Sequence, residues 1–150
     1  MHRFARRVYA VAGIYGLLVM LPQYFLENRI GRDSPPAITH PEYFYGFVGL
    51  ALVWQLCFLL IAREPERFRP LMPITVLEKL AFGVPAVALY ASHRISAQVL
   101  AFGVLDLLLG TLFAIAYLRL RAVGADQAGS GRGRAGTRRS AAACSSAITG

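Results

Sequence analysis

The chain has 150 residues, of which 56% are hydrophobic, and its mean hydropathy of +0.49 is too high for an ordinary soluble domain of this size. Its 16 basic and 8 acidic side chains give a net charge of +8, but the arginines flank apolar segments, which indicates orientation in a membrane rather than nucleic-acid binding. Two cysteines without a CxxC pair and three histidines without metal-ligand spacing argue against thiol redox chemistry and against a metal site.

The first half of the chain predicts two membrane helices. A basic start, MHRFARR, precedes the apolar run 8–26, which lacks the cleavage site of a secretory signal and is expected to be an uncleaved first span, kinked by Pro22. A polar connection with three prolines and no apolar periodicity follows. Thr39 and Glu42 have the spacing of a capping box, so we expect the second span, 42–62, to begin there.

The second half of the chain predicts two more membrane helices. The link REPERFRP returns the chain to a third span, 71–91, in which Pro85 is internal and should bend the helix. Ser96 suits the N-cap of a fourth span, 96–120. Each of the four spans has roughly the 20 residues that cross a hydrocarbon core of about 30 Å.

The predicted architecture is all-α: a four-transmembrane-helix bundle with short connections over 1–121, then a disordered basic tail over 122–150. The tail is rich in Gly, Ala, Ser and Arg and offers little apolar surface to bury. We expect a multi-pass protein of a bacterial inner membrane. The positive-inside rule places both termini in the cytoplasm, because eight arginines flank the spans on that side and only Arg29, Arg32 and Arg94 lie on the other.

Four polar side chains inside the spans form a candidate intramembrane polar site: Gln55, Glu78, Lys79 and Asp106. Lys79 leans toward the start of its helix, so we expect it to snorkel to cytoplasmic water. Glu78 lies at the estimated depth of Gln55, and we favour a hydrogen bond between the two. The alternative for Glu78 is a proton-binding carboxylate in a transport path.

Asp106 shares a stripe of its helix with Gly103 and Gly110, small residues that let another helix approach closely. Its estimated position is about 20 Å from the cytoplasmic face, roughly two turns deeper than Glu78. We therefore expect the two carboxylates to form separate polar contacts, with Lys79 reaching Asp106 only if the helices are offset. A hydrogen bond within the packing interface is the favoured role of Asp106.

The run GVLDLLLG from Gly103 to Gly110, together with the compact four-span layout, resembles the small bacterial DoxX-like membrane proteins, which carry an acidic residue followed by glycine in a corresponding helix. The resemblance implies a four-helix membrane protein with an accessory role, linked in some cases to respiratory or redox complexes. It carries over no catalytic residue.

We therefore expect a protein without enzymatic activity that serves as an accessory subunit or binds a small lipophilic ligand. Its expected partners are the lipid bilayer and either a membrane protein complex or further copies of itself. We expect no catalytic residue, cofactor, metal or nucleic acid, since no aromatic residues alternate with the tail arginines to stack on bases. The alternative is a small proton-coupled transporter acting as an oligomer, with Glu78 or Asp106 carrying the proton. A membrane enzyme ranks third, because no nucleophile and base stand together in the sequence.

Overall fold

A computed structural model describes the backbone of residues 2–33 and 37–146 and the side chains of this part up to residue 122. Within it every regular element is a helix, which confirms the all-α prediction. The elements in chain order are α1 (His2–Met20), the 3₁₀ helix η1 (Leu21–Phe25), α2 (Glu27–Asp33), α3 (Pro41–Arg63), the 3₁₀ helix η2 (Arg69–Leu71), α4 (Met72–Ala91) and α5 (Ala97–Ser146). The disordered tail expected over 122–150 lies, from residue 123 on, outside the part whose side chains are described, and it stays a prediction.

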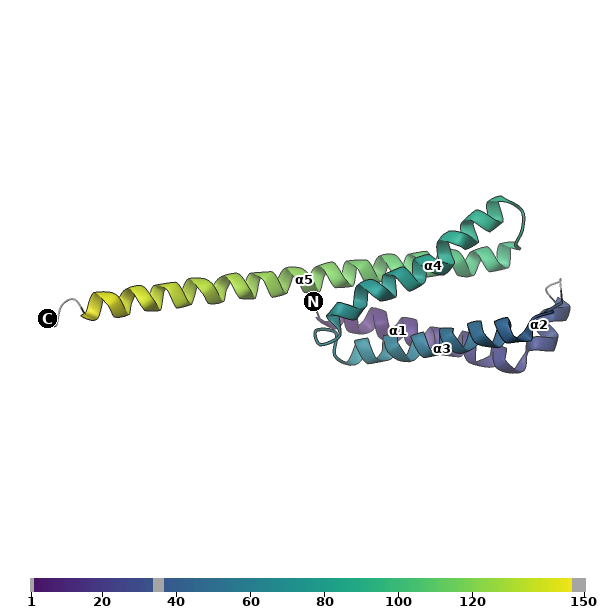
Figure 1. Cartoon of the computed structure of the whole chain (residues 1–150), viewed down its shortest axis with the longest axis horizontal. Helices are drawn as coiled ribbons and strands as arrows, with labels where there is room; N and C mark the ends of the chain where they lie inside the picture. The colour runs from purple at the N-terminus through teal and green to yellow at the C-terminus, as the bar shows by residue number, and fades with distance from the viewer. Residues whose placement is uncertain (1, 34–36, 147–150) are drawn as a thin grey trace.

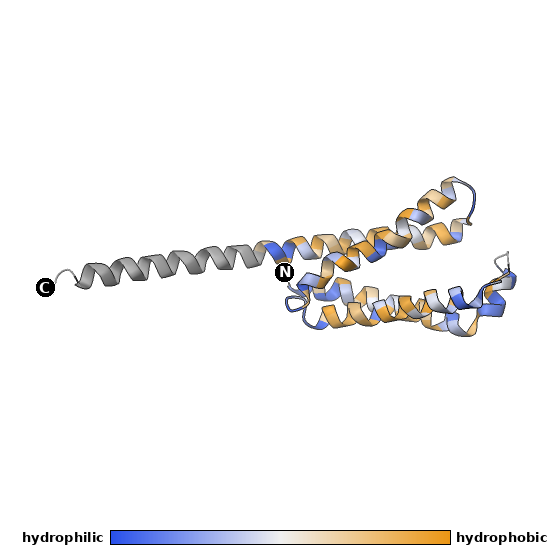
Figure 2. Ribbon diagram, viewed as in Figure 1, coloured by the Kyte–Doolittle hydropathy of each residue, from blue (hydrophilic) through white to orange (hydrophobic). Residues whose placement is uncertain are grey.

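Within the described residues, four segments are long and apolar enough to cross a membrane: His2–Phe25, Pro41–Arg63, Arg69–Ala91 and Ala97–Ala122. Apolar residues line all four, whereas hydrophilic residues gather at their ends and in α2 (Figure 2). Only 22% of each apolar window is buried against the rest of the chain, so most of this apolar surface faces outward. A soluble protein rarely exposes apolar patches of this extent.

Local contacts at the helix ends correct some expectations and confirm one. The predicted capping box of Thr39 and Glu42 is wrong. α3 begins at Pro41, and His40 takes the N-cap position without a side-chain cap bond. Proline itself suits the first helical position. The Glu42 carboxylate contacts His40 Nδ1 instead, at 3.3 Å. The Ser96 hydroxyl accepts from the Val99 amide at 3.5 Å, which confirms the predicted N-cap of α5.

The first connection also differs from its prediction. The helical start extends back to His2, beyond the apolar run 8–26, and α1 passes into η1 next to Pro22. The supposed structureless connection contains α2, in which Arg29 Nε lies 3.4 Å from Asp33 Oδ2, one turn later. Such exposed pairs contribute only about 0.3–0.5 kcal/mol. The helix was not predicted because its sequence, ENRIGRD, has no apolar periodicity.

The helices form two antiparallel hairpins, α1 with α3 and α4 with α5, and α1 also contacts α5 (Figure 1). Small residues set the close approach of α4 and α5. A Cβ atom on Gly103 would lie 2.5 Å from the Cβ of Ala86, and one on Gly83 would lie 2.6 Å from Leu107 Cγ. Gly103 thus lies on a packing face, as its stripe predicted.

A buried aromatic cluster joins the hairpins near the 64–71 link. The ring of Tyr9 stacks on Phe113 with centroids 4.1 Å apart, and Phe58 meets Phe113 edge-on at 5.0 Å, so α1, α3 and α5 converge there. Tyr9 Oη lies 2.7 Å from Thr75 Oγ1 of α4. The Thr75 hydroxyl donates to the Met72 carbonyl, also at 2.7 Å, so Tyr9 is the donor to Thr75.

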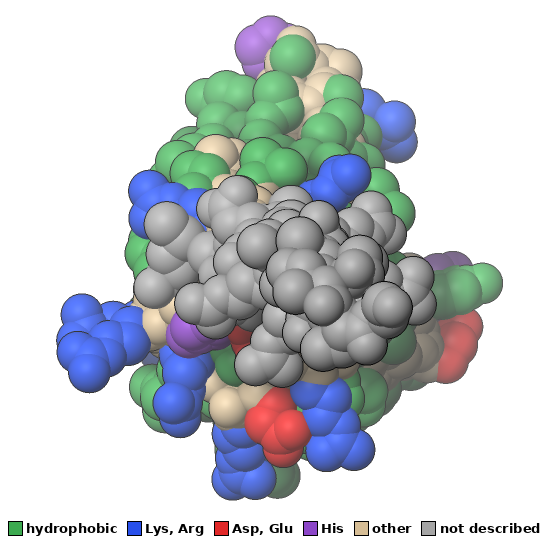
Figure 3. All heavy atoms as spheres, turned by 90° about the vertical axis from the view of Figure 1, so that its left-hand side faces the viewer, with side chains coloured by type: hydrophobic (Ala, Val, Ile, Leu, Met, Phe, Trp, Pro, Cys, Tyr) green, Lys and Arg blue, Asp and Glu red, His purple; other side chains and the backbone are tan. Residues whose placement is uncertain are grey.

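Basic side chains surround this same end of the bundle, onto which Figure 3 looks. Three separate contacts tie its segments together. Arg6 Nε donates to the Ala62 carbonyl at 3.3 Å, and the guanidinium of Arg119 lies 4.7 Å from the ring centre of Phe4. His2 Nε2 lies 3.4 Å from Glu66 Oε1 in the link. The start of α1, the link and the part of α5 around Arg119 are therefore neighbours.

Candidate functional site

A cavity of about 530 Å³ lies between the two hairpins and is lined by α1, η1, α2 and α3 on one side and by α4 and α5 on the other. Most of its wall is apolar. All four polar residues that the sequence singled out line it: Gln55, Glu78, Lys79 and Asp106. Concave, mainly apolar cavities with a few polar groups are the usual form of a small-molecule site.

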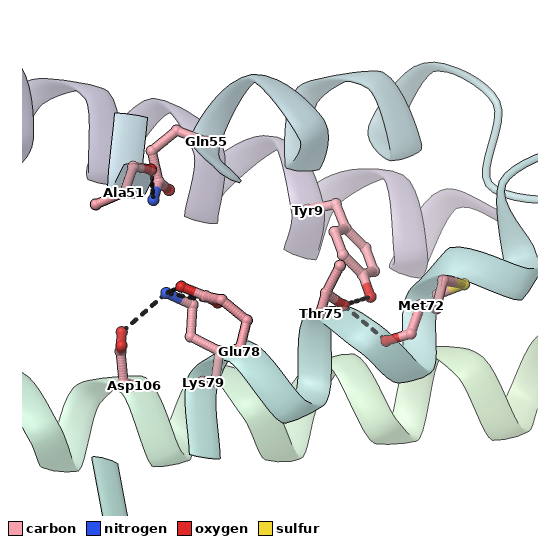
Figure 4. Close-up of polar contacts among 8 residues, drawn as sticks. All are labelled: Tyr9, Ala51, Gln55, Met72, Thr75, Glu78, Lys79 and Asp106. Carbon is pink, nitrogen blue, oxygen red and sulfur yellow. Dashed lines mark hydrogen bonds and ion pairs between the residues drawn. The ribbon is translucent and has the colours of Figure 1, made fainter. Parts of the chain in front are cut away.

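Lys79 is the centre of an ionic cluster that also contains Glu78 and Asp106 (Figure 4). Its Nζ donates to Asp106 Oδ1 at 3.1 Å and to Glu78 Oε1 at 3.4 Å, and it lies 5.1 Å from the ring centre of Phe58. The Lys79 side chain is only 6% exposed. The expectation that Lys79 snorkels to water is therefore wrong, because its ammonium turns toward two carboxylates inside the bundle.

The register between α4 and α5 explains why the lysine reaches Asp106. A Cβ atom on Gly110 would lie 3.1 Å from the Cβ of Lys79, so these two residues face each other, and Asp106 lies about one turn earlier in α5. One turn rises about 5.4 Å, which the lysine side chain can span. The sequence estimate placed Glu78 and Asp106 two turns apart because it measured each helix from its own predicted end. Instead of separate contacts, the two carboxylates share one lysine.

Gln55 takes a different partner from the one expected. Its side-chain nitrogen donates to the Ala51 carbonyl one turn earlier at 2.9 Å, and no hydrogen bond to Glu78 occurs among the described residues. The Gln55 side chain packs against Gly16 of α1, where a Cβ atom would collide with it. Because Gly16 has no side chain, the Gln55 amide can pack against α1. Gln55 and Glu78 therefore lie on facing walls of the cavity (Figure 4).

One carboxylate oxygen of Glu78 has no hydrogen-bond partner in the described part of the chain. Its Oε2 is buried and lies 3.4 Å from Lys79 Nζ, close enough for an ion pair but without hydrogen-bond geometry. Buried polar atoms nearly always have a hydrogen-bond partner, so this oxygen stands out. It shows that the Lys79 ammonium leaves the Glu78 carboxylate incompletely paired.

Aromatic residues in the cavity wall were missed as site residues. Phe82 and Phe102 each lie one turn from a carboxylate of the cluster, at i+4 from Glu78 and i−4 from Asp106, a spacing that the sequence does contain. Phe47 comes from α3, with its ring 6.1 Å from that of Phe82. Its position depends on how the two hairpins face each other, for which the sequence gives no signal.

Comparison of the sequence with family models found no match, and comparisons with curated proteins and with solved structures found none either. The resemblance to DoxX-like proteins therefore stays a prediction, carried by one run in α5. Among residues 2–33 and 37–122, no group of three or more His, Cys, Asp or Glu side chains stands close enough to hold a metal ion.

Proposed function

We propose that the chain is a small multi-pass membrane protein that binds a lipophilic ligand in the cavity between its hairpins. The observation that carries this proposal is the cavity itself: about 530 Å³, mostly apolar, with a single ionic cluster in its wall. This volume lies within the roughly 300–1,000 Å³ of small-molecule sites. An accessory role in a larger membrane complex would be compatible with such binding, and the apolar outer surface would then contact lipid or partner helices.

The proposed setting is a bacterial inner membrane with both termini on the cytoplasmic side. It is supported by the arginines around the end that holds the start of α1, the 64–71 link and residues 119–121. The test uses single cysteines in a chain without Cys57 and Cys144, labelled in intact cells by a membrane-impermeant maleimide. Arg94→Cys should react directly and Glu66→Cys only after permeabilisation. Reaction of Glu66→Cys in intact cells would reverse the orientation, and equal reaction of both would contradict the membrane setting.

A photoactivatable apolar probe, adamantyl diazirine, tests ligand binding in lipid nanodiscs. Labelling of Phe82 and Phe102 should saturate with probe concentration, because a cavity has a finite capacity, whereas labelling of outward residues should rise linearly. Ala51→Trp, which fills the cavity, should abolish the saturable part. Val53→Trp is the matched control, since Val53 lies on the same helix and is 63% exposed. The proposal would be overturned if the unmodified protein showed no saturable labelling, or if Ala51→Trp showed as much of it as the unmodified protein.

Proton-coupled transport is a second candidate, favoured by one observation. The cluster places two carboxylates around one ammonium, so binding of one proton would bring its net charge to zero. Liposomes that contain the protein and a pH-sensitive dye test this function. Proton flux that is lost in both Glu78→Gln and Asp106→Asn would support it. Flux that is equal in the unmodified protein and both variants would exclude these carboxylates as carriers.

A further inference from the structure

The cavity between the hairpins carries an uneven charge. Among the described residues in its wall, the charged side chains are Glu78, Lys79 and Asp106, which are two carboxylates and one ammonium. In their ordinary ionic forms they have one negative charge in excess. A charge away from water is costly unless it is paired, so the cluster favours a positively charged guest over a neutral or negative one.

The excess negative charge lies on Glu78 rather than on Asp106. Asp106 Oδ1 receives the shorter contact from the shared ammonium, 3.1 Å, whereas both Glu78 oxygens lie 3.4 Å from it. Among the described residues only one of these two oxygens takes part in a hydrogen bond, and the other, Oε2, is buried without such a partner. Glu78 lines the cavity and its side chain is 19% exposed, so a cation in the cavity can approach this carboxylate without displacing Lys79 from Asp106.

The walls beside the cluster suit the rest of such a guest. Four aromatic side chains line the cavity, from α1, α3, α4 and α5: Tyr15, Phe47, Phe82 and Phe102. The faces of aromatic rings attract cations, and several rings around one space are a known way to hold an organic cation. From the cluster the cavity extends to Ile30 in α2 and Gln98 near the start of α5, which leaves room for an apolar body beyond the charged group.

We propose that the ligand is a singly charged organic cation with a bulky apolar body. Its charge would lie beside the Glu78 carboxylate and its body along the aromatic wall. This inference rests on the proposed ligand-binding function and names the class of ligand. Such a ligand also supplies the positive charge that balances the cluster.

Two ions of the same shape and opposite charge, tetraphenylphosphonium and tetraphenylborate, test the proposal. Each is measured by equilibrium dialysis against the protein in nanodiscs, with the uptake of empty nanodiscs subtracted. We expect saturable binding of the phosphonium and at least about tenfold weaker binding of the borate, since one charge-assisted contact is worth that much. Equal binding of the two ions would overturn the inference of a cation. Failure of the phosphonium to bind, with saturable diazirine labelling intact, would also overturn it and leave the lipophilic site standing.

Substitutions then assign the charge to its residue. Glu78→Gln keeps the size of the side chain and should weaken phosphonium binding about tenfold or more, whereas Glu42→Gln should leave it unchanged because Glu42 is exposed at the start of α3. Diazirine labelling that still saturates in Glu78→Gln shows that its cavity is intact. Unchanged phosphonium affinity in that variant would contradict the role of Glu78. If the variant does not fold, the comparison of the two ions on the unmodified protein still decides.

Discussion

Removal of the shared cation is the sharpest perturbation of the cluster. Lys79→Met keeps the length of the side chain but leaves Glu78 and Asp106 without a counter-charge in a site where the three side chains are 6%, 19% and 20% exposed. Loss of one partner of a buried pair typically costs about 3–5 kcal/mol. Asp106→Asn and Glu78→Gln each leave the lysine with one carboxylate, so each should cost less, about 1 kcal/mol.

The assay is reversible unfolding in mixed micelles of a mild detergent and dodecyl sulfate, followed by the helical signal in circular dichroism. We predict that Lys79→Met loses much more unfolding free energy than either acid substitution. A loss for Lys79→Met that is no larger than the loss for Asp106→Asn would refute the reasoning, because it would mean that the lysine does not hold both carboxylates.

Two further predictions concern contacts outside the cavity. A double-mutant cycle of Tyr9→Phe and Thr75→Val should give a coupling of about 0.6 kcal/mol, the mean of such cycles in one well-studied helical membrane protein, and additive losses would contradict the bond between these side chains. Gly103→Ala should cost about 1–3 kcal/mol in the same unfolding assay, because the new Cβ atom meets the Cβ of Ala86. Gly46→Ala is the control and should be neutral or slightly stabilising, since nothing lies within 4 Å of its Cβ position; equal losses at both glycines would contradict the close packing of α4 on α5.

The helices were predictable because their signals are local. The second span, expected over 42–62, is α3, Pro41–Arg63, and the third, expected over 71–91, is α4, Met72–Ala91. In each case a long apolar run ends at charged or turn-forming residues, and no information from elsewhere in the chain is needed to read it. The short helix α2 was missed because it has no apolar face to reveal it.

The members of the cluster were predictable, but their pairing was not. Charged groups in apolar segments are costly, so the sequence alone singles out Glu78, Lys79 and Asp106. Which of them meet depends on the register between α4 and α5, and this is set by side-by-side packing such as that of Gly110 on Lys79. Such packing brings together residues that are far apart in the chain. The periodicity along one helix therefore cannot predict which residues meet.

The account depends most on Lys79 being closed inside the bundle, and the chain offers a direct measurement because this is its only lysine. The protein in nanodiscs is treated with a water-soluble acylating reagent, and modification of the peptide that contains Lys79 is followed by mass spectrometry before and after unfolding. We predict that Lys79 stays unmodified in the folded protein and reacts once the bundle is unfolded. Modification of the folded protein at the rate of a free lysine would contradict the ionic cluster, and with it the charge on which the cation site rests.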